Sequence, residues 1–133
     1  MQQGYILGVG TNVDSKRNAL KIILELRLRF ASVLVSQFYS TEPVGMSSKQ
    51  TFINFCVFIE TALEPRACKA VCAAIEVHLG RDRTHALSST RDRPADIDLL
   101  TRIGADGSRL ELGGVPAYLV APAAEIVAML WPT

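Results

Sequence analysis

The order of apolar patterns along the chain constrains its fold more than any other feature. Runs typical of buried strands alternate with two stretches of helical periodicity. In chain order they predict strand, helix, strand, strand, helix and strand, over residues 4–10, 15–30, 32–39, 52–61, 65–80 and 96–101. This β-α-β-β-α-β order is the ferredoxin-like pattern. It predicts an α+β fold with an antiparallel sheet and both helices on one face.

Smaller elements are expected after residue 101. Gly104 and Gly107 mark a turn, and an edge strand is expected over 108–112. The apolar tail, rich in alanine and proline, predicts a short helix near 122–130.

Length and composition predict a single domain over residues 1–133 that buries its own core. Hydrophobic residues make up 49% of the chain, and the formal net charge is +1, so nothing indicates a nucleic-acid partner. No apolar run has the length of a membrane span, and the first residues lack the features of a signal peptide. We therefore expect a cytoplasmic protein with no membrane partner.

The three cysteines are Cys56, Cys68 and Cys72, and an odd number argues against a disulfide framework. Cys68 and Cys72 are four residues apart, a spacing that would suit a metal. They also share one helical stripe with Val71, Ile75 and Leu79. We expect these cysteines to pack in the core as small apolar residues.

The stretch RDRPADIDLL at residues 91–100 places two like charges in a strand. A strand has a period of two, so Asp96 and Asp98 point to the same face, with Cα atoms about 7 Å apart. Ile97 points to the opposite face. Two carboxylates this close repel each other unless a cation relieves them, and Mg²⁺ is usually held by one or two carboxylates plus substrate phosphates. The arginines upstream, Arg81, Arg83, Arg91 and Arg93, would then neutralise phosphate oxygens.

A surface cluster of ion pairs explains the same residues without any metal. In that interpretation Asp96 and Asp98 pair with Arg91 and Arg93. The D-x-D pattern taken alone is a weak motif, so both interpretations stay open on the residues alone.

Asn54 interrupts an otherwise apolar strand, FINFCVFIET. A buried amide needs hydrogen-bond partners. Asn54 either satisfies a nearby loop backbone or recognises a planar heterocycle, for which its donor and acceptor are suited. Phe52 shares its face and would stack on such a ring. The loop at residues 41–45 would wall the pocket.

Five pieces of the chain together resemble a known family. They are LGVGTN, FYSTEPVG, FINFCVFIET, IEVHLGRDR and RDRPADIDLL, and they cover roughly residues 5–100. The chain resembles 6-hydroxymethyl-7,8-dihydropterin pyrophosphokinases of folate biosynthesis. The resemblance implies a ferredoxin-like fold, transfer of pyrophosphate from ATP to the pterin hydroxymethyl group, and a monomer.

The resemblance also implies roles for individual residues. Asp96 and Asp98 would hold two Mg²⁺ ions and form the catalytic group with Arg81 and Arg93. The implied pterin pocket consists of Thr41, Pro43, Val44, Phe52 and Asn54. The implied ATP contacts are Glu76, Arg81, Arg83, Arg93, Leu99 and Tyr118.

The chain departs from the family pattern both before and after the D-x-D pair. The loop before the D-x-D pair lacks the usual Trp-Gly-Pro-Arg, and Ala117 replaces a histidine in Val115-Pro116-Ala117-Tyr118. No arginine follows Arg109, and the C-terminal portion is shorter than is usual. Two alternatives therefore stand beside the enzyme: a pterin-binding protein without catalysis, and a ferredoxin-like interaction module that binds neither ligand.

Overall fold

Six strands and three helices make up the part of the chain that the computed structural model describes, residues 2–41, 51–81 and 94–132. In chain order they are β1 (Gly4–Thr11), α1 (Ser15–Arg29), β2 (Val33–Val35), β3 (Tyr39–Thr41), β4 (Phe52–Glu60), α2 (Pro65–His78), β5 (Asp96–Ile103), β6 (Arg109–Glu111) and α3 (Ala117–Leu130). The predicted order is confirmed, with β2 and β3 together in place of the second strand.

The strands form one antiparallel sheet in the order β2-β4-β1-β5-β6, and β3 also pairs with β4. β1 is therefore central, between β4 and β5. The helix α1 leads from β1 to β2 and leaves the position between them to β4. This is the arrangement of a ferredoxin-like fold.

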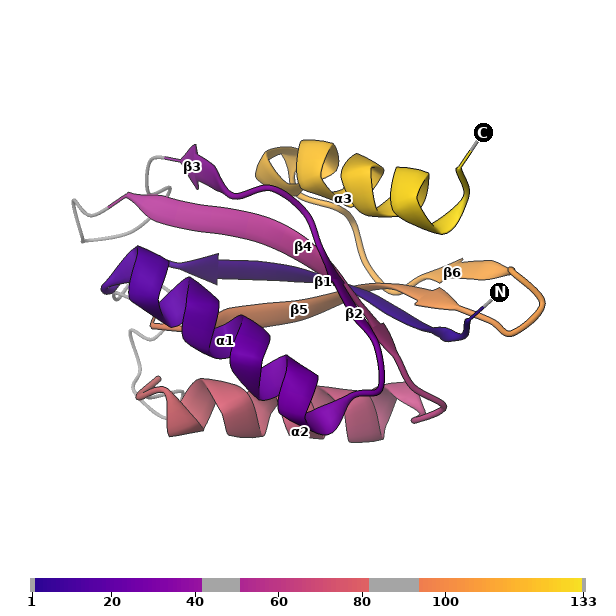
Figure 1. Ribbon diagram of the computed structural model, residues 1–133, viewed down its shortest axis with the longest axis horizontal. Coiled ribbons are helices and arrows are strands. Elements are labelled where there is room, and N and C mark those ends of the chain that lie inside the picture. The colour runs from indigo at the N-terminus through magenta and orange to yellow at the C-terminus, as the bar shows by residue number, and fades with distance from the viewer. Residues whose placement is uncertain (1, 42–50, 82–93, 133) are drawn as a thin grey trace.

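The first core layer lies between the sheet and the helices α1 and α2, which cover one face as predicted (Figure 1). Alternate residues of β1 supply Tyr5, Leu7 and Val9 to this layer, because side chains of a strand alternate between faces. The expected apolar face of α1 is buried here: Ala19, Ile22, Ile23, Leu26 and Phe30. Cys68 and Cys72 are free thiols buried in the same layer, which confirms that they pack in the core.

The second core layer lies on the opposite face, under α3 (Figure 1). This helix begins at Ala117, five residues before the start that the sequence predicts, and contains Pro122. Its buried residues Leu119 and Ile126 pack against side chains such as Cys56 and Phe58. The statement that the helices share one face therefore holds for α1 and α2 only. A further helix covers the other face because β1 and β4 are apolar on both sides.

The second predicted strand, 32–39, is wrong as a single element, because it breaks between β2 and β3. Ser36 donates its backbone N–H to the Cys56 carbonyl at 2.9 Å, but the Cys56 N–H donates to the Ser36 hydroxyl, also at 2.9 Å. A side-chain oxygen thus replaces a backbone acceptor, and the regular ladder stops at this point.

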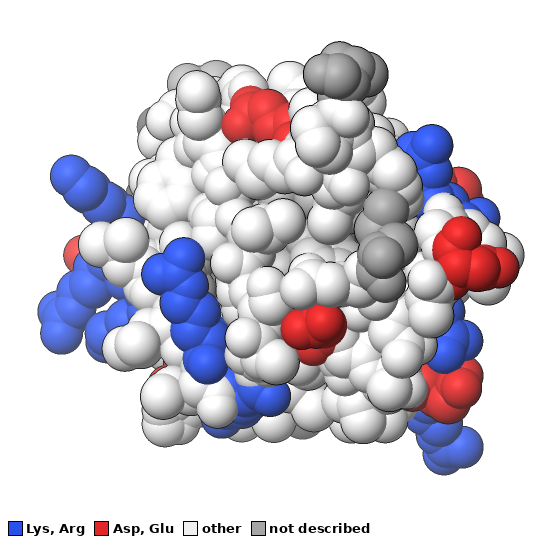
Figure 2. Space-filling model, turned by 45° about the vertical axis from the view of Figure 1, so that its right-hand side comes forward, with Lys and Arg blue, Asp and Glu red and all other residues white. Residues whose placement is uncertain are grey.

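Charged side chains are unevenly spread over the surface. In the view of Figure 2, lysines and arginines predominate on the left, both signs mix on the right, and the broad area between is uncharged except for isolated acidic groups. None of the helices in the described ranges combines the length and the apolar character needed to cross a bilayer.

Candidate active site

Two glycines on the central strand open a hollow in the face that α3 covers. Gly10 pairs with Asn54 of β4 on one side and with Asp96 of β5 on the other. A Cβ atom on Gly10 would lie 2.9 Å from Asn54 Oδ1. Without side chains, the backbone of β1 becomes a floor between its neighbours. The residues lining this hollow come from β1, β4, β5 and the first turn of α3: Gly8, Val9, Gly10, Asn54, Asp96, Asp98, Tyr118 and Leu119.

The two aspartates form the β5 wall of the hollow. Asp96 pairs with Gly10 and Asp98 with Gly8, so both carboxylates lie on one face, as the strand period predicts. Asp98 is exposed and Asp96 half-buried, whereas Ile97 between them is buried in the layer under α1 and α2. The aspartates are thus placed at the end of a rigid strand with their carboxylates at the hollow.

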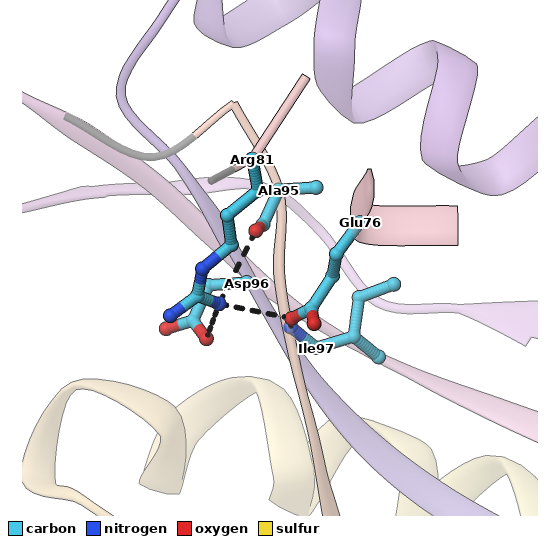
Figure 3. A network of polar contacts seen from close by, with 5 residues as sticks. All are labelled: Glu76, Arg81, Ala95, Asp96 and Ile97. Carbon is cyan, nitrogen blue, oxygen red and sulfur yellow. Dashed lines mark hydrogen bonds and ion pairs between the residues drawn. The ribbon is translucent and has the colours of Figure 1, made fainter. Parts of the chain in front are cut away.

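One guanidinium nitrogen ties the end of α2 to the beginning of β5 (Figure 3). Arg81 Nη1 donates to Asp96 Oδ1 at 2.7 Å, to Glu76 Oε2 at 3.0 Å and to the Ala95 carbonyl at 3.4 Å. The arginine side chain is only 9% exposed. Partly buried pairs of this kind are screened far less by water than surface pairs.

Glu76 of α2 is the second acidic partner of Arg81. It is 1% exposed, and its Oε2 also accepts the backbone N–H of Ile97 at 2.7 Å. A buried carboxylate is costly unless it is paired and hydrogen-bonded, and Glu76 meets both conditions. Glu76 therefore fixes both Arg81, which bonds to Asp96, and the start of β5, which carries the two aspartates.

Arg81 still has a hydrogen-bond donor to offer. Its Nε is buried, and none of the described residues accepts a hydrogen bond from it. Buried donors without a partner are rare and need an explanation. The Asp96 partner expected from a surface cluster, Arg91 or Arg93, lies outside the described residues; within the described part, Arg81 takes that position.

The donor set at the hollow suits a hard cation bound together with a substrate. Among the described residues, no group of three or more histidine, cysteine, aspartate or glutamate side chains forms a closed metal site. Mg²⁺ does not require one, because it keeps several waters and is usually held by one or two carboxylates and by phosphate oxygens. Asp96 and Asp98 are two carboxylates at this hollow.

The residues predicted to bind a planar heterocycle lie on the β4 side of the hollow, and the β1 backbone separates them from the aspartates on β5. Asn54 is 3% exposed and lines the hollow. Phe52 is half-buried, and its Cδ1 would be 3.5 Å from a Cβ on Gly10. The backbone of Thr41 pairs with that of Phe52. The other two predicted residues of this set, Pro43 and Val44, lie outside the described residues.

The residues expected around ATP are more scattered. Glu76 and Arg81 belong to the buried cluster, and Tyr118 lines the hollow beside Asn54. Leu99 packs against the core layer under α1 and α2, on the face opposite the aspartates. Arg83 and Arg93 lie outside the described residues.

A carboxylate on α3 fastens the beginning of β3 near this hollow. Glu125 Oε1 accepts the Gln37 N–H at 2.8 Å, and Oε2 accepts the hydroxyl of Tyr39. These bonds, the Gln37 bond first, hold the pKa of Glu125 below its usual value. The same carboxylate raises the pKa of Tyr39. Tyr39 pairs with Asn54, so Glu125 anchors the strand next to the amide.

Sequence reasoning missed the two glycines and Glu125. Gly8 and Gly10 do not complete a dinucleotide fingerprint, so that motif does not single them out. Their spacing of two inside a buried strand was the available signal, since it removes side chains from one face. Glu125 left no such signal, because its partners are 86 and 88 residues away.

Comparison with known proteins decides the family. The profile of the 7,8-dihydro-6-hydroxymethylpterin-pyrophosphokinase (HPPK) family matches residues 6–129. The chain belongs to this pyrophosphokinase family. The match extends over α3 and so includes the region where the chain departs from the family pattern.

Several relatives carry the name 2-amino-4-hydroxy-6-hydroxymethyldihydropteridine pyrophosphokinase. One from Porphyromonas gingivalis is 36% identical over 96 residues, which is 71% of this chain and 65% of the relative. One from Methylorubrum extorquens is 34% identical over 135 residues, covering 95% of this chain and 83% of the relative. One from Bacillus subtilis is 32% identical over 97 residues, 71% of this chain and 56% of the relative. The chain thus spans slightly less than two thirds of the Porphyromonas relative.

Proposed function

We propose that the protein transfers the pyrophosphoryl group of ATP to 6-hydroxymethyl-7,8-dihydropterin, a step of folate biosynthesis. One observation carries the proposal: Asn54, Gly10 and Asp96 stand in one row across the sheet. A side chain suited to a planar heterocycle and one suited to a metal-bound phosphate thus face each other over a bare backbone floor. Membership of the pyrophosphokinase family supports it.

The pterin ring binds on the β4 side of the hollow. Asn54 offers a donor and an acceptor to the ring edge. Phe52 and Tyr118 provide aromatic surfaces near the floor, and Tyr118, 46% exposed at the first turn of α3, lines the hollow itself. We therefore assign Tyr118 to the pterin ring rather than to ATP. Thr41, Pro43 and Val44 complete the pocket in this proposal.

The triphosphate binds on the β5 side. The Nε of Arg81 donates to a phosphate oxygen, which would satisfy this buried donor. Glu76 holds the guanidinium in place through the bond at 3.0 Å. Arg83 and Arg93 add positive charge, and Leu99 supports β5 from the core side. Catalysis of this reaction consists mainly of positioning and charge neutralisation, which these residues provide.

Asp96 and Asp98 would hold two Mg²⁺ ions, which when bound would neutralise phosphate oxygens and orient the triphosphate. In the reaction the substrate hydroxyl oxygen releases its proton to solvent and forms a bond to the β-phosphorus of ATP. The bond between this phosphorus and the oxygen bridging to the α-phosphorus breaks, and AMP leaves. Asn54 and Phe52 keep the hydroxymethyl group in line with the bond that breaks.

The proposal is tested by an assay of AMP formation with 6-hydroxymethyl-7,8-dihydropterin, ATP and Mg²⁺. The variant Asp98→Ala tests the role of the aspartates. Its side chain is exposed, so its loss should leave the fold intact. We expect pterin-dependent AMP formation by the parent, and a loss of about 10³-fold or more in the variant. Circular dichroism should show the same helix content in both proteins.

Two results would count against the proposal. AMP formation that does not need the pterin would indicate a different acceptor. Pterin binding by calorimetry without AMP formation would indicate a family pocket that serves recognition alone.

The remaining proposals concern organisation. Residues of every described range contribute to the same sheet, which supports a single domain over residues 1–133. We propose that it acts as a cytoplasmic monomer. Sedimentation velocity at the concentration of the assay would show a single species near the chain mass of 14.5 kDa.

A further inference from the structure

The helix α1 carries an apolar stripe on the side that faces solvent. Leu20, Leu24 and Leu28 are 55%, 58% and 71% exposed. Residues four apart lie above one another on a helix, so the three leucines form one line along α1. The face of α1 that packs on the sheet is separate and already complete. The stripe therefore adds nothing to the core layer.

Cations surround this stripe. At about 100° per residue, Lys16 and Arg27 fall on one side of the leucines, Lys21 on the other, and Arg17 within the line. The single acidic residue of α1, Glu25, lies at the edge turned toward α2, where it pairs with Arg29 and lies 3.8 Å from His78. The solvent side of α1 is thus apolar and positively charged.

The amino-terminal half of the stripe is hollowed. The described residues that line this shallow depression are Lys16, Arg17, Leu20, Lys21 and Leu24. Its surface is almost wholly apolar, because the basic side chains contribute their methylene stems and hold their charges at the rim. An apolar depression with a rim of like charge selects for a ligand that is apolar in the middle and oppositely charged around it.

We propose that the solvent side of α1 is a docking surface for an acidic amphipathic segment of another protein. Leucine-sized side chains of that segment occupy the depression at Leu20 and Leu24 and extend to Leu28. Its flanking aspartates and glutamates pair with Lys16, Arg17, Lys21 and Arg27. Exposed apolar surface with a polar rim is the usual mark of such contacts.

A protein segment fits this surface better than a lipid bilayer does. Helices that lie in a membrane interface combine a basic polar face with a broad apolar face of tryptophan, phenylalanine and leucine. The helix α1 contains no aromatic residue, and its apolar face is one leucine wide.

The test uses a synthetic fluorescent peptide as the probe. Its leucines recur with the spacing of Leu20, Leu24 and Leu28, and glutamates occupy the flanking positions. Binding is followed by fluorescence anisotropy, with a second peptide in which lysines replace the glutamates. We expect saturable binding of the acidic peptide, weakened by added salt, and no binding of the basic one.

Variants of the protein show where the peptide binds. Leu24→Asp and the pair Lys16→Glu with Lys21→Glu should each weaken binding by about tenfold or more. Leu110→Asp is the matched control, because Leu110 is 59% exposed on β6 and lies outside the proposed surface. Circular dichroism checks that all variants are folded.

Three outcomes would overturn the proposal. The first is the absence of saturable binding of the acidic peptide. The second is equal binding by the Leu24→Asp and Leu110→Asp variants. The third is co-sedimentation with vesicles of phosphatidylcholine and phosphatidylserine that Leu24→Asp abolishes, since the surface would then bind lipid.

Discussion

The two faces of the sheet use the same central strand for different purposes. Toward α1 and α2, β1 presents Tyr5, Leu7 and Val9, which are fully packed. Toward α3, it presents Ile6 and then the two glycines, Gly8 and Gly10. Packing is therefore continuous on one face, whereas on the other it stops where the hollow begins. The strand period of two keeps these two functions apart.

This difference separates stability from activity along a single strand. The face under α1 and α2 contains the larger cluster of buried apolar side chains. The face with the hollow lacks side chains of β1 at two positions. Leu119 of α3 fills the space over Gly8, and polar groups gather beside Gly10. Substitutions on the two faces should therefore have different consequences, and the predictions below are ordered by the size of the expected effect.

The largest effect is expected for Leu7→Ala, on the packed face. Leu7 is completely buried, and removal of its branched end leaves a cavity that costs about 2–5 kcal/mol. Urea unfolding measures this loss. The exposed Leu110→Ala should change the free energy of unfolding by less than about 0.5 kcal/mol. The folded Leu7→Ala protein should keep the pterin KM of the parent, and a changed KM would mean that the faces are coupled.

The next largest effect is expected for Glu76→Gln. Glu76 lies on α2, and through Arg81 it is linked to Asp96 at the hollow on the other face of the sheet. The amide oxygen of the introduced glutamine still accepts the Ile97 N–H, but Arg81 loses a charged partner in a buried site. We expect a loss of about 1–3 kcal/mol in unfolding experiments and a lower kcat.

The exposed pair of Glu64 with Arg102 provides the comparison for this buried pair. Glu64→Gln should cost less than about 1 kcal/mol, because water screens exposed pairs. Equal losses in the two variants would contradict the structural role given to Glu76.

A smaller and more local effect is expected for Gly10→Ala. The new methyl group would lie 2.9 Å from Asn54 Oδ1, so the amide must move. We expect the pterin KM to rise about tenfold, with the helix content unchanged. Val9→Ala is the matched control on the other face, and it should lower stability without a change in KM. An unchanged KM for Gly10→Ala would show that the hollow does not receive the pterin.

The smallest effect is expected at Glu125, and it depends on pH. The pKa of Glu125 is lowered in the folded protein, so its bonds to Gln37 and Tyr39 stabilise the fold above the ordinary glutamate value of 4.5. This stabilisation is lost as the pH falls through the lowered pKa. Glu125→Gln should therefore lower the melting temperature slightly at neutral pH and flatten its decline below about pH 4.5. The prediction would be contradicted if the melting temperatures of the parent and the variant fell equally steeply with pH below about 4.5.

The element order, the apolar face of α1 and the shared face of the two aspartates could be predicted from the sequence, because they follow from local periodicity. The break at Ser36 and the early start of α3 could not. The first depends on a hydroxyl that meets Cys56 of another strand. The second depends on apolar residues of β1 and β4 that need a cover on their second face.

The sequence by itself determined the composition of the site, whereas the tertiary structure decided its geometry. Asn54 and the pair Asp96 and Asp98 could be recognised from their local context as polar groups in buried strands. Only the register of three strands places Asn54 and Asp96 in one row with Gly10 between them, and Asp98 opposite Gly8. Only the fold brings Glu76 under Arg81 and Glu125 against Tyr39. Local sequence patterns act over a few residues. Strand register and helix docking join residues that are far apart in the chain. The contacts of Asn54, Glu76 and Glu125 therefore become visible only in the folded protein.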